Sequence, residues 1–340
     1  MTTSSTLTND TSRGRWAYGL ALCAALFAIP LVIFGGSVTT LGAGLAVEGW
    51  LVAEGHFMLF LPIDTWIGDT HRFVEHVHRI FGTIVGLFAV GSCVMAWLAS
   101  KRGAQTKSSA VLATTALLAV IVQGVIGGQR VELFSDDLAF LHGALAQAVL
   151  AMLFVAALVL SARWRNSNAD NGGDGKEQGV TPRGLAMTAV VVTYLQIVFG
   201  AAYRHALRPD DNPEAVGLLY VHLFVALIVF GVLLLLCRKL KEASTVNGAG
   251  EHLARQAQRI HMLLGLQILL GLMAWMGYRP GSLAPLEWAL SVLHVLVGGL
   301  LLAQVVASAM WSSKLAPRRV IREVTRNDKG AAPAPVGGNA

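Results

Sequence analysis

Residues 216–237 read VGLLYVHLFVALIVFGVLLLLC, a run of 22 residues without Asp, Glu, Lys or Arg. A helix rises about 1.5 Å per residue, so this run is long enough to cross the ~30 Å hydrocarbon core of a bilayer. Its backbone groups would find no water there and must bond within the segment, and the run lacks the alternating polarity of a barrel strand. The run therefore predicts a transmembrane helix that carries one histidine, His222.

Seven further apolar runs have the same character. The chain is 54% hydrophobic and only 14% charged, whereas soluble domains contain about 25% charged residues. The composition thus excludes an ordinary soluble globule and predicts an all-α membrane protein. The eight predicted spans are residues 16–37, 77–99, 109–128, 138–162, 183–204, 216–237, 259–278 and 287–311.

The distribution of basic residues predicts the orientation. The termini and the segments 100–108, 163–183 and 238–259 together hold 20 of the 26 Lys and Arg residues. By the positive-inside rule this side is cytoplasmic, which places both termini in the cytoplasm and the chain in the cell (plasma) membrane. The net charge of +6 then gathers at the cytoplasmic face, where it favours orientation and attraction to anionic lipid over nucleic-acid binding.

The two halves of the chain repeat a short pattern. Gln123-x-x-x-Gly127 recurs 144 residues later as Gln267-x-x-x-Gly271, and His78 recurs at the same offset as His222. Helices five and one carry a related pair of patterns, QIVFG at 196–200 and LVIFG at 31–35. Repeats of this kind predict two pseudosymmetric four-helix bundles.

The predicted domains follow from the repeat and from the polar segments. Residues 1–15 form a polar cytoplasmic N-terminus, 16–164 the first bundle, 165–182 a cytoplasmic linker, 183–312 the second bundle and 313–340 a disordered tail. Residues 40–74 form a long outer loop, rich in aromatic residues, that we interpret as an ordered lid or an interfacial anchor. The three cysteines lie in apolar runs without a CxxC motif, so we interpret them as packing residues.

Four histidines stand at matching positions near the outer ends of four spans: His78, His142, His222 and His294. Each half should therefore place two imidazoles at similar depth on neighbouring helices. Two facing imidazoles suit the axial positions of a heme iron, whereas zinc needs three or four ligands around one point. The other histidines are predicted to have surface or interfacial roles: His56, His71, His76, His205, His252 and His261.

The two pairs differ in their neighbours. Glu75 and Arg79 flank His78 on nearly the same helix face, whereas Leu219 stands where the second half would need a matching carboxylate. Identical pairs would favour simple electron transfer. Unequal pairs favour one reactive site and one site that supplies electrons.

Three motifs resemble those of the heme A synthase family: GSVTTLGAGL at 36–45, EHVHR at 75–79 and LHG at 141–143, together with the two second-half histidines. The resemblance extends over all eight spans. It implies that His222 and His294 hold a heme b. It also implies that Glu75, His78 and His142 form the catalytic site, in which the two histidines face the iron of heme O and Arg79 pairs with a propionate or with Glu75. Many members carry a cysteine pair in the first outer loop, and this loop has none.

The activity implied by the resemblance is oxidation of the C8 methyl of heme O to a formyl group, with water as the oxygen source, for cytochrome c oxidase assembly. The implied partners are a heme O synthase as donor, the oxidase assembly machinery and a membrane electron acceptor. The oligomeric state is left open, a homo-oligomer included.

Two alternatives remain open from the residues. The first is a diheme b-type electron-transfer protein without substrate chemistry. The second is a transporter, which the parallel repeats and the placement of polar residues near the outer ends disfavour.

Overall fold

The computed structural model describes residues 3–167, 182–207, 213–246, 250–277 and 284–315, with side chains described from Ser12 onward. Within these residues it contains eight helices long and apolar enough to cross a membrane. They lie in α1 (Thr3–Thr40), α2 (Thr70–Lys101), α3 (Lys107–Glu132), α4 (Asp136–Leu160), α6 (Arg183–Ala206), α7 (Pro213–Val246), α8 (Gly250–Gly277) and α9 (Pro285–Lys314). The predicted all-α membrane fold is confirmed. A short helix, α5 (Ala162–Asn166), follows α4.

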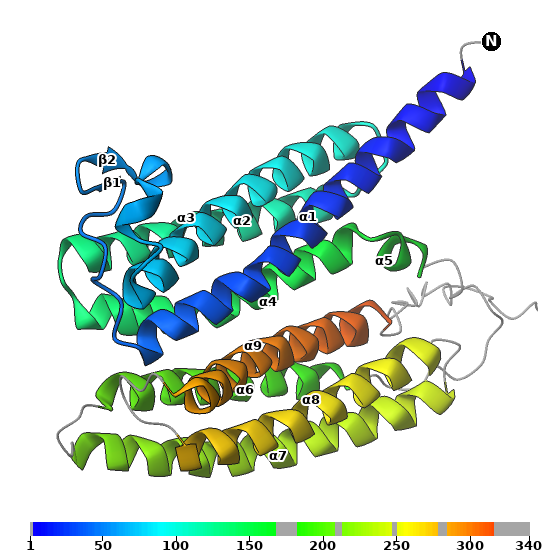
Figure 1. The fold of residues 1–340 in the computed structure, drawn as a ribbon. Helices are drawn as coiled ribbons and strands as arrows, with labels where there is room; N and C mark the ends of the chain where they lie inside the picture. Colours follow the sequence, from blue (N-terminus) through cyan, green and yellow to red (C-terminus); the bar gives the residue numbers. More distant parts are fainter. Residues whose placement is uncertain (1–2, 168–181, 208–212, 247–249, 278–283, 316–340) are drawn as a thin grey trace, which may run out of the picture.

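The helices form two groups of four (Figure 1). In the first, α1 contacts α2 and α4, and α3 contacts α2 and α4; in the second, α6 contacts α7 and α9, and α8 contacts α7 and α9. In each group, every helix thus contacts the next one along the chain, and the first helix contacts the last. A pseudosymmetric relation between the two bundles stays a prediction.

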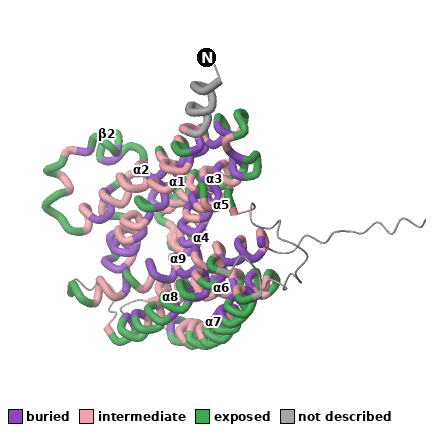
Figure 2. Tube along the Cα trace, turned by 90° about the vertical axis from the view of Figure 1, so that its right-hand side faces the viewer, coloured by how far each residue is buried: buried purple, intermediate pink, exposed green. Residues whose placement is uncertain are grey.

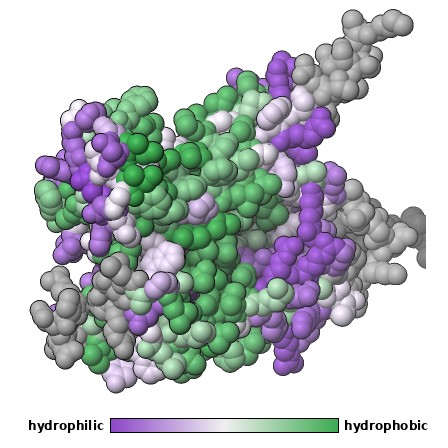
Figure 3. All heavy atoms as spheres, in the orientation of Figure 1, coloured by the Kyte–Doolittle hydropathy of each residue, from purple (hydrophilic) through white to green (hydrophobic). Residues whose placement is uncertain are grey.

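An apolar band covers the middle of the face seen in Figure 3, and hydrophilic residues gather at the two ends of this face. One end carries the segment between α1 and α2, and the other carries α5 and the start of α8 (Figure 1). Many large apolar side chains of the band are exposed, among them Leu227 at 71% and Phe224 at 64% on α7. Such a surface suits lipid and not water.

Local sequence signals define several helix ends. Asp69 begins α2 as its N-cap, because its carboxylate accepts hydrogen bonds from the backbone N–H groups of His71 and Arg72 at 2.8 and 3.0 Å. The bonds from Arg72 and His71 also lower the pKa of the Asp69 carboxyl. Ser135 caps α4 in the same way through the N–H of Leu138, 3.2 Å from its hydroxyl. Helix α2 therefore starts before the predicted span at 77–99, and Glu75 lies on the helix.

The segment between α1 and α2 is folded. Strands β1 (Val52–Ala53) and β2 (His56–Phe57) pair through a two-residue turn, Glu54-Gly55, in which both residues have positive φ, 51° and 81°. The turns η1 (Met58–Phe60) and η2 (Ile63–Thr65) follow. A small core beneath them consists of Val47, Ala53 and Leu61, with Trp66 against it.

Helix α4 of the first bundle and helix α9 of the second contact each other at the centre of the molecule (Figure 2). Gly299 of α9 makes their close approach possible. A Cβ at this position would lie 2.1 Å from Oε1 of Gln147 and 2.9 Å from Cδ2 of Leu150 on α4. Both of these side chains are buried, so they have little room to retreat.

We expect Gly299→Ala to destabilise the protein by about 1–3 kcal/mol, because the added methyl overpacks the α4–α9 contact. The measurement is the melting temperature of the purified protein in detergent. Gly231→Ala on α7 is the matched control, since a Cβ there would meet nothing within 4 Å. Equal melting temperatures for the two variants would contradict the role of Gly299.

Candidate functional site: two histidine pairs

The first pair joins α2 to α4. The imidazole rings of His78 and His142 have centroids 6.2 Å apart and planes 84° apart. Both rings lie inside the first bundle, near the end that carries the β1–β2 hairpin. The structure thus brings together two of the residues that the sequence predicts to act in one site.

The second pair joins α7 to α9. The centroids of His222 and His294 are 6.5 Å apart, and the planes are 75° apart. The two pairs therefore have nearly the same geometry, although they lie in different bundles. Neither member of this pair has a carboxylate three residues before it, because Leu219 and Ser291 occupy those positions.

A glycine of the neighbouring helix makes room for each imidazole. A Cβ at Gly127 would lie 2.7 Å from Cε1 of His142. A Cβ at Gly35, Gly200 or Gly271 would lie 2.8 Å from Cε1 of His78, His222 or His294. These distances are shorter than any ordinary carbon–carbon contact. The glycines of the repeated sequence pattern are therefore the surfaces on which the four histidine rings rest.

The residue four positions before each glycine also contacts the ring. Nδ1 of His78 lies 3.0 Å from the carbonyl oxygen of Leu31, and Nδ1 of His142 lies 3.1 Å from that of Gln123. In the second bundle, Nε2 of Gln196 lies 3.1 Å from Nδ1 of His222. A hydrogen bond from Nδ1–H to a carbonyl orients an imidazole and leaves Nε2 available for a metal. The glutamines were not predicted as histidine partners, although their repetition was visible.

The geometry of both pairs fits a bis-histidine heme. A metal–imidazole bond is about 2.0 Å, and a ring centroid lies roughly 1.1 Å from its nitrogen, so two rings that held one ion between them would have centroids about 6.2 Å apart. The observed separations are 6.2 and 6.5 Å. Within the described ranges no group of three or more His, Cys, Asp or Glu side chains could hold a metal ion, which disfavours a zinc centre.

Glu75 and Arg79 form a buried ion pair one turn from His78. Nη2 of Arg79 donates to Oε1 of Glu75 at 2.7 Å, and the exposed fractions of the two side chains are 8% and 3%. Oε2 of Glu75 accepts the backbone N–H of Val47 at 2.9 Å. Arg79 also donates to the carbonyl oxygens of Gly49 and Val47, at 2.7 and 2.9 Å. The pair therefore holds the outer segment against α2, next to the first histidine pair.

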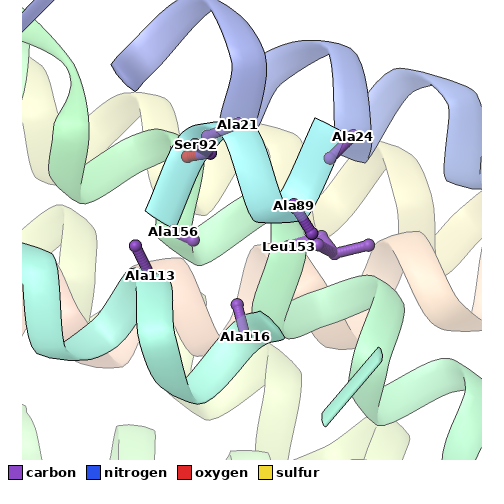
Figure 4. Close-up of a pocket in the computed structure, with 8 residues that line it drawn as sticks. All are labelled: Ala21, Ala24, Ala89, Ser92, Ala113, Ala116, Leu153 and Ala156. Atoms are coloured by element: carbon purple, nitrogen blue, oxygen red, sulfur yellow. The ribbon is translucent and has the colours of Figure 1, made fainter. Parts of the chain in front are cut away.

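The first bundle contains a small hollow that is not this site (Figure 4). Its lining has neither a histidine nor a charged group, and consists of Ala21, Ala24, Ala89, Ser92, Ala113, Ala116, Leu153 and Ala156. These small residues let α1–α4 approach closely. The candidate site is defined by the histidine pairs instead.

Comparison with known proteins gives a family match that covers the first bundle and α6. Residues 14–208 match the COX15-CtaA family, whose description is cytochrome oxidase assembly protein. The chain belongs to this family. Its members are heme A synthases, oxidoreductases of heme biosynthesis, so the resemblance stated from the motifs is confirmed. The matched residues include the first histidine pair with Glu75 and Arg79, and end before the second pair. No curated protein matches the chain.

Arg130 lies beside the first histidine pair and was not predicted from the sequence as a candidate site residue. Its Nη2 donates to the carbonyl oxygen of Gly44 at 2.9 Å, which ties α3 to the GSVTTLGAGL segment. Beside it, Gly128 lies against Trp50, whose Cδ2 would be 2.0 Å from a Cβ. The Trp50 backbone N–H donates to Glu132 at 2.9 Å. These contacts cross 78 to 86 residues of sequence, so no local pattern could predict them.

Two residues at the end of α6 lie between the bundles. Arg204 donates to the carbonyl oxygen of Gly36 at 2.7 Å and to the Thr40 hydroxyl on α1. The ring of His205 faces Phe140 of α4 at 6.1 Å between centroids. His205 was predicted for the surface or interface and instead packs against the helix of His142.

His76 also departs from its predicted surface position. Its side chain is 1% exposed because Trp66 of the outer segment covers it, with ring centroids 4.6 Å apart. The sequence predicted a surface or interfacial role, because His76 is two residues from His78 and points away from it on the helix. The folded outer segment, which contains Trp66, buries the His76 side chain.

Proposed function

We propose that this chain oxidises the C8 methyl group of heme O to a formyl group and thereby makes heme A for cytochrome c oxidase assembly. The net change is addition of one water to the methyl carbon with release of four protons and four electrons. The water supplies the formyl oxygen, and a membrane electron acceptor takes up the electrons. The observation that carries the proposal is the inequality of two otherwise similar histidine pairs: among the described residues, only the first pair has a buried ion pair, Glu75–Arg79, beside it and a folded segment above it.

In this proposal His78 and His142 bind the iron of heme O in the first bundle. Their Nδ1 atoms face carbonyl oxygens, which orients Nε2 toward a ligand between the helices. Glu75 places a carboxylate one helical turn from His78, where it can accept a proton released by the substrate. Arg79 keeps that carboxylate in position, and Arg130 adds a second guanidinium at the same end. Either cation suits a propionate of the porphyrin.

His222 and His294 hold a resident heme b in the second bundle. Heme b supplies a one-electron redox centre when bound. The amide of Gln196 lies 3.1 Å from Nδ1 of His222, and that of Gln267 lies 3.3 Å from Nε2 of His294, so the Gln267 amide would move away from Nε2 when that nitrogen held the heme. The contacts of Arg204 with α1 fix the second bundle against the first, which keeps the two pairs at a constant separation.

The surrounding reactions follow from this chemistry. A heme O synthase supplies the substrate, and the oxidase assembly machinery receives the product. The chain spans the plasma membrane with both termini in the cytoplasm, so the histidine pairs lie near the outer leaflet.

The decisive experiment is co-expression of the chain with a heme O synthase in a host that makes no heme A. Heme A or hydroxylated heme O in the pigment extract is the expected result. A folded, heme-loaded protein that yields neither would refute the proposal and favour the diheme electron-transfer alternative.

The glycines beneath the histidines make a prediction about heme b. We expect Gly271→Ala to weaken retention of heme b at least tenfold, because the new methyl displaces the ring of His294. The measurement is the heme content and absorption spectrum of the purified protein. The control is Gly265→Ala on the same helix, where a Cβ would meet nothing within 4 Å. Unchanged heme retention in Gly271→Ala would show that the glycine is not needed for ligation.

A further inference from the structure

A cluster of cations and aromatic rings lies at the end of the molecule opposite the histidine pairs. It is formed by α5, the beginning of α8 and the end of α9, which meet there beside the junction of the bundles (Figure 1). Hydrophilic side chains gather at this end, directly next to the apolar band (Figure 3). The predicted orientation makes this the cytoplasmic end.

Aromatic rings form the base of the cluster. Trp311 of α9 is 1% exposed, and its ring stacks on His252 of α8 with centroids 4.5 Å apart. Trp164 of α5 meets Trp311 edge to face at 4.8 Å. Tryptophan is enriched at the level of the lipid headgroups, where one side of the ring is apolar and the other is wet. The base is therefore rigid and lies at the depth of a headgroup.

Four cations surround this base: Arg163, Arg255, Arg259 and Lys314. The guanidinium carbon of Arg163 lies 6.0 Å from the Trp311 ring centroid, and Nζ of Lys314 lies 4.1 Å from that of Trp164. Arg163 contacts Nδ1 of His252 at 3.1 Å, and Lys314 donates to the carbonyl oxygen of Trp164.

These cations have too little negative charge around them. Burial and the nearby guanidinium groups of Arg255 and Arg259 lower the pKa of Arg163. The carboxylate in the cluster is that of Glu251, which pairs with Arg255. In the described part of the chain, neither Arg163 nor Arg259 has an ion pair with a carboxylate. Like charges held together destabilise the site, so an added anion would stabilise it.

The surface of α8 shows what kind of anion fits. Arg255 and Arg259 continue along the same helix face into Met262, Leu266 and Leu269, at spacings of three and four residues. These apolar side chains are 66%, 43% and 55% exposed. A charged end followed by an exposed apolar stripe matches the headgroup and acyl chain of a phospholipid. A free phosphate would use only the charged end.

We propose that the α5–α8–α9 cluster binds the phosphate group of an anionic phospholipid whose acyl chain lies along Met262, Leu266 and Leu269. Basic pockets between transmembrane helices on the cytoplasmic side bind headgroups of this class. The site lies between the bundles, so the lipid would join α5, at the end of the first bundle, to α8 and α9 of the second.

The test uses the full-length protein in detergent, with bound lipid counted by native mass spectrometry. The probes are phosphatidylglycerol and cardiolipin, with phosphatidylcholine as the zwitterionic comparison. Arg259→Gln changes an exposed side chain and should not disturb folding. We expect it to weaken anionic lipid binding about fivefold, since each cation near the surface contributes about that factor. Arg163→Gln combined with Arg259→Gln should weaken binding further.

Arg238→Gln is the matched control, because it removes a cation at the same end of the molecule from α7, where Arg238 is 75% exposed and pairs with Glu242. Leu266→Gln tests the acyl stripe and should weaken lipid binding without changing the charge. Equal losses in Arg259→Gln and Arg238→Gln would overturn the proposal, because binding would then depend on net charge alone. Displacement of the lipid by millimolar inorganic phosphate, with no effect of Leu266→Gln, would also overturn it in favour of a free phosphate site.

Discussion

Replacing His222 or His294 with alanine should remove the bound heme b and its absorbance from the purified protein. Each substitution deletes one of two imidazoles whose ring centroids, 6.5 Å apart, fit the two faces of one porphyrin. The lost imidazole also leaves a gap against Gly200 or Gly271, where its ring rested. We expect the heme content of the second bundle to fall below a tenth of the wild-type value.

His261→Ala is the control for this experiment. His261 lies on α8, and its ring bonds to the carbonyl oxygen of Ala257 at 3.0 Å, away from the pair. The spectrum should then match that of the wild type. Retention of full heme b absorbance in His222→Ala, with loss in His78→Ala, would instead assign the resident heme to the first bundle.

The sequence predicted the fold because lipid imposes simple rules on it. Long apolar runs must form helices, and all eight predicted spans coincide with helices of the structure. The ends were less well predicted. Helix α2 begins at Thr70, seven residues before the predicted span, because Asp69 caps it and the folded outer segment covers its first turns. Composition cannot detect such cover, which depends on residues brought from elsewhere in the chain.

Some residues of the candidate site were predictable from the sequence and others were not. The four histidines were predictable because an imidazole within an apolar span is rare and the spacing repeats. The supporting residues were not, because Arg130 and Arg204 contact backbone oxygens 86 and 168 residues away. The glycines show an intermediate case: their repetition was visible in the sequence, and its reason, the space for a ring, needs the structure.

Replacement of Glu75 is the second substitution that we expect to have a large effect on heme A formation. We expect Glu75→Gln to keep heme b and to reduce heme A formation by about 10²–10⁴-fold, the usual contribution of a general base. The amide can still accept the N–H of Val47, which the carboxylate accepts at 2.9 Å, so the outer segment should remain attached. The substitution removes the negative charge, the ability to take a proton and one of the two acceptor oxygens, so Arg79 also loses its carboxylate partner. The measurement is the heme A content of pigment extracts, normalised to heme b.

Two comparisons separate this chemical role from a purely structural one. Glu54→Gln removes a carboxylate from the same outer segment, where it pairs with Arg72 away from the histidines, and should leave product formation nearly unchanged. Glu75→Ala removes the acceptor as well and leaves Arg79 buried without its carboxylate, which costs about 3–5 kcal/mol and should loosen the segment. If Glu75 only anchored the segment, Glu75→Gln would retain most activity and Glu75→Ala alone would lose it. Because the proposed role needs a proton acceptor, both variants should lose product, and Glu75→Ala should lose more stability than Glu75→Gln, which keeps one acceptor oxygen.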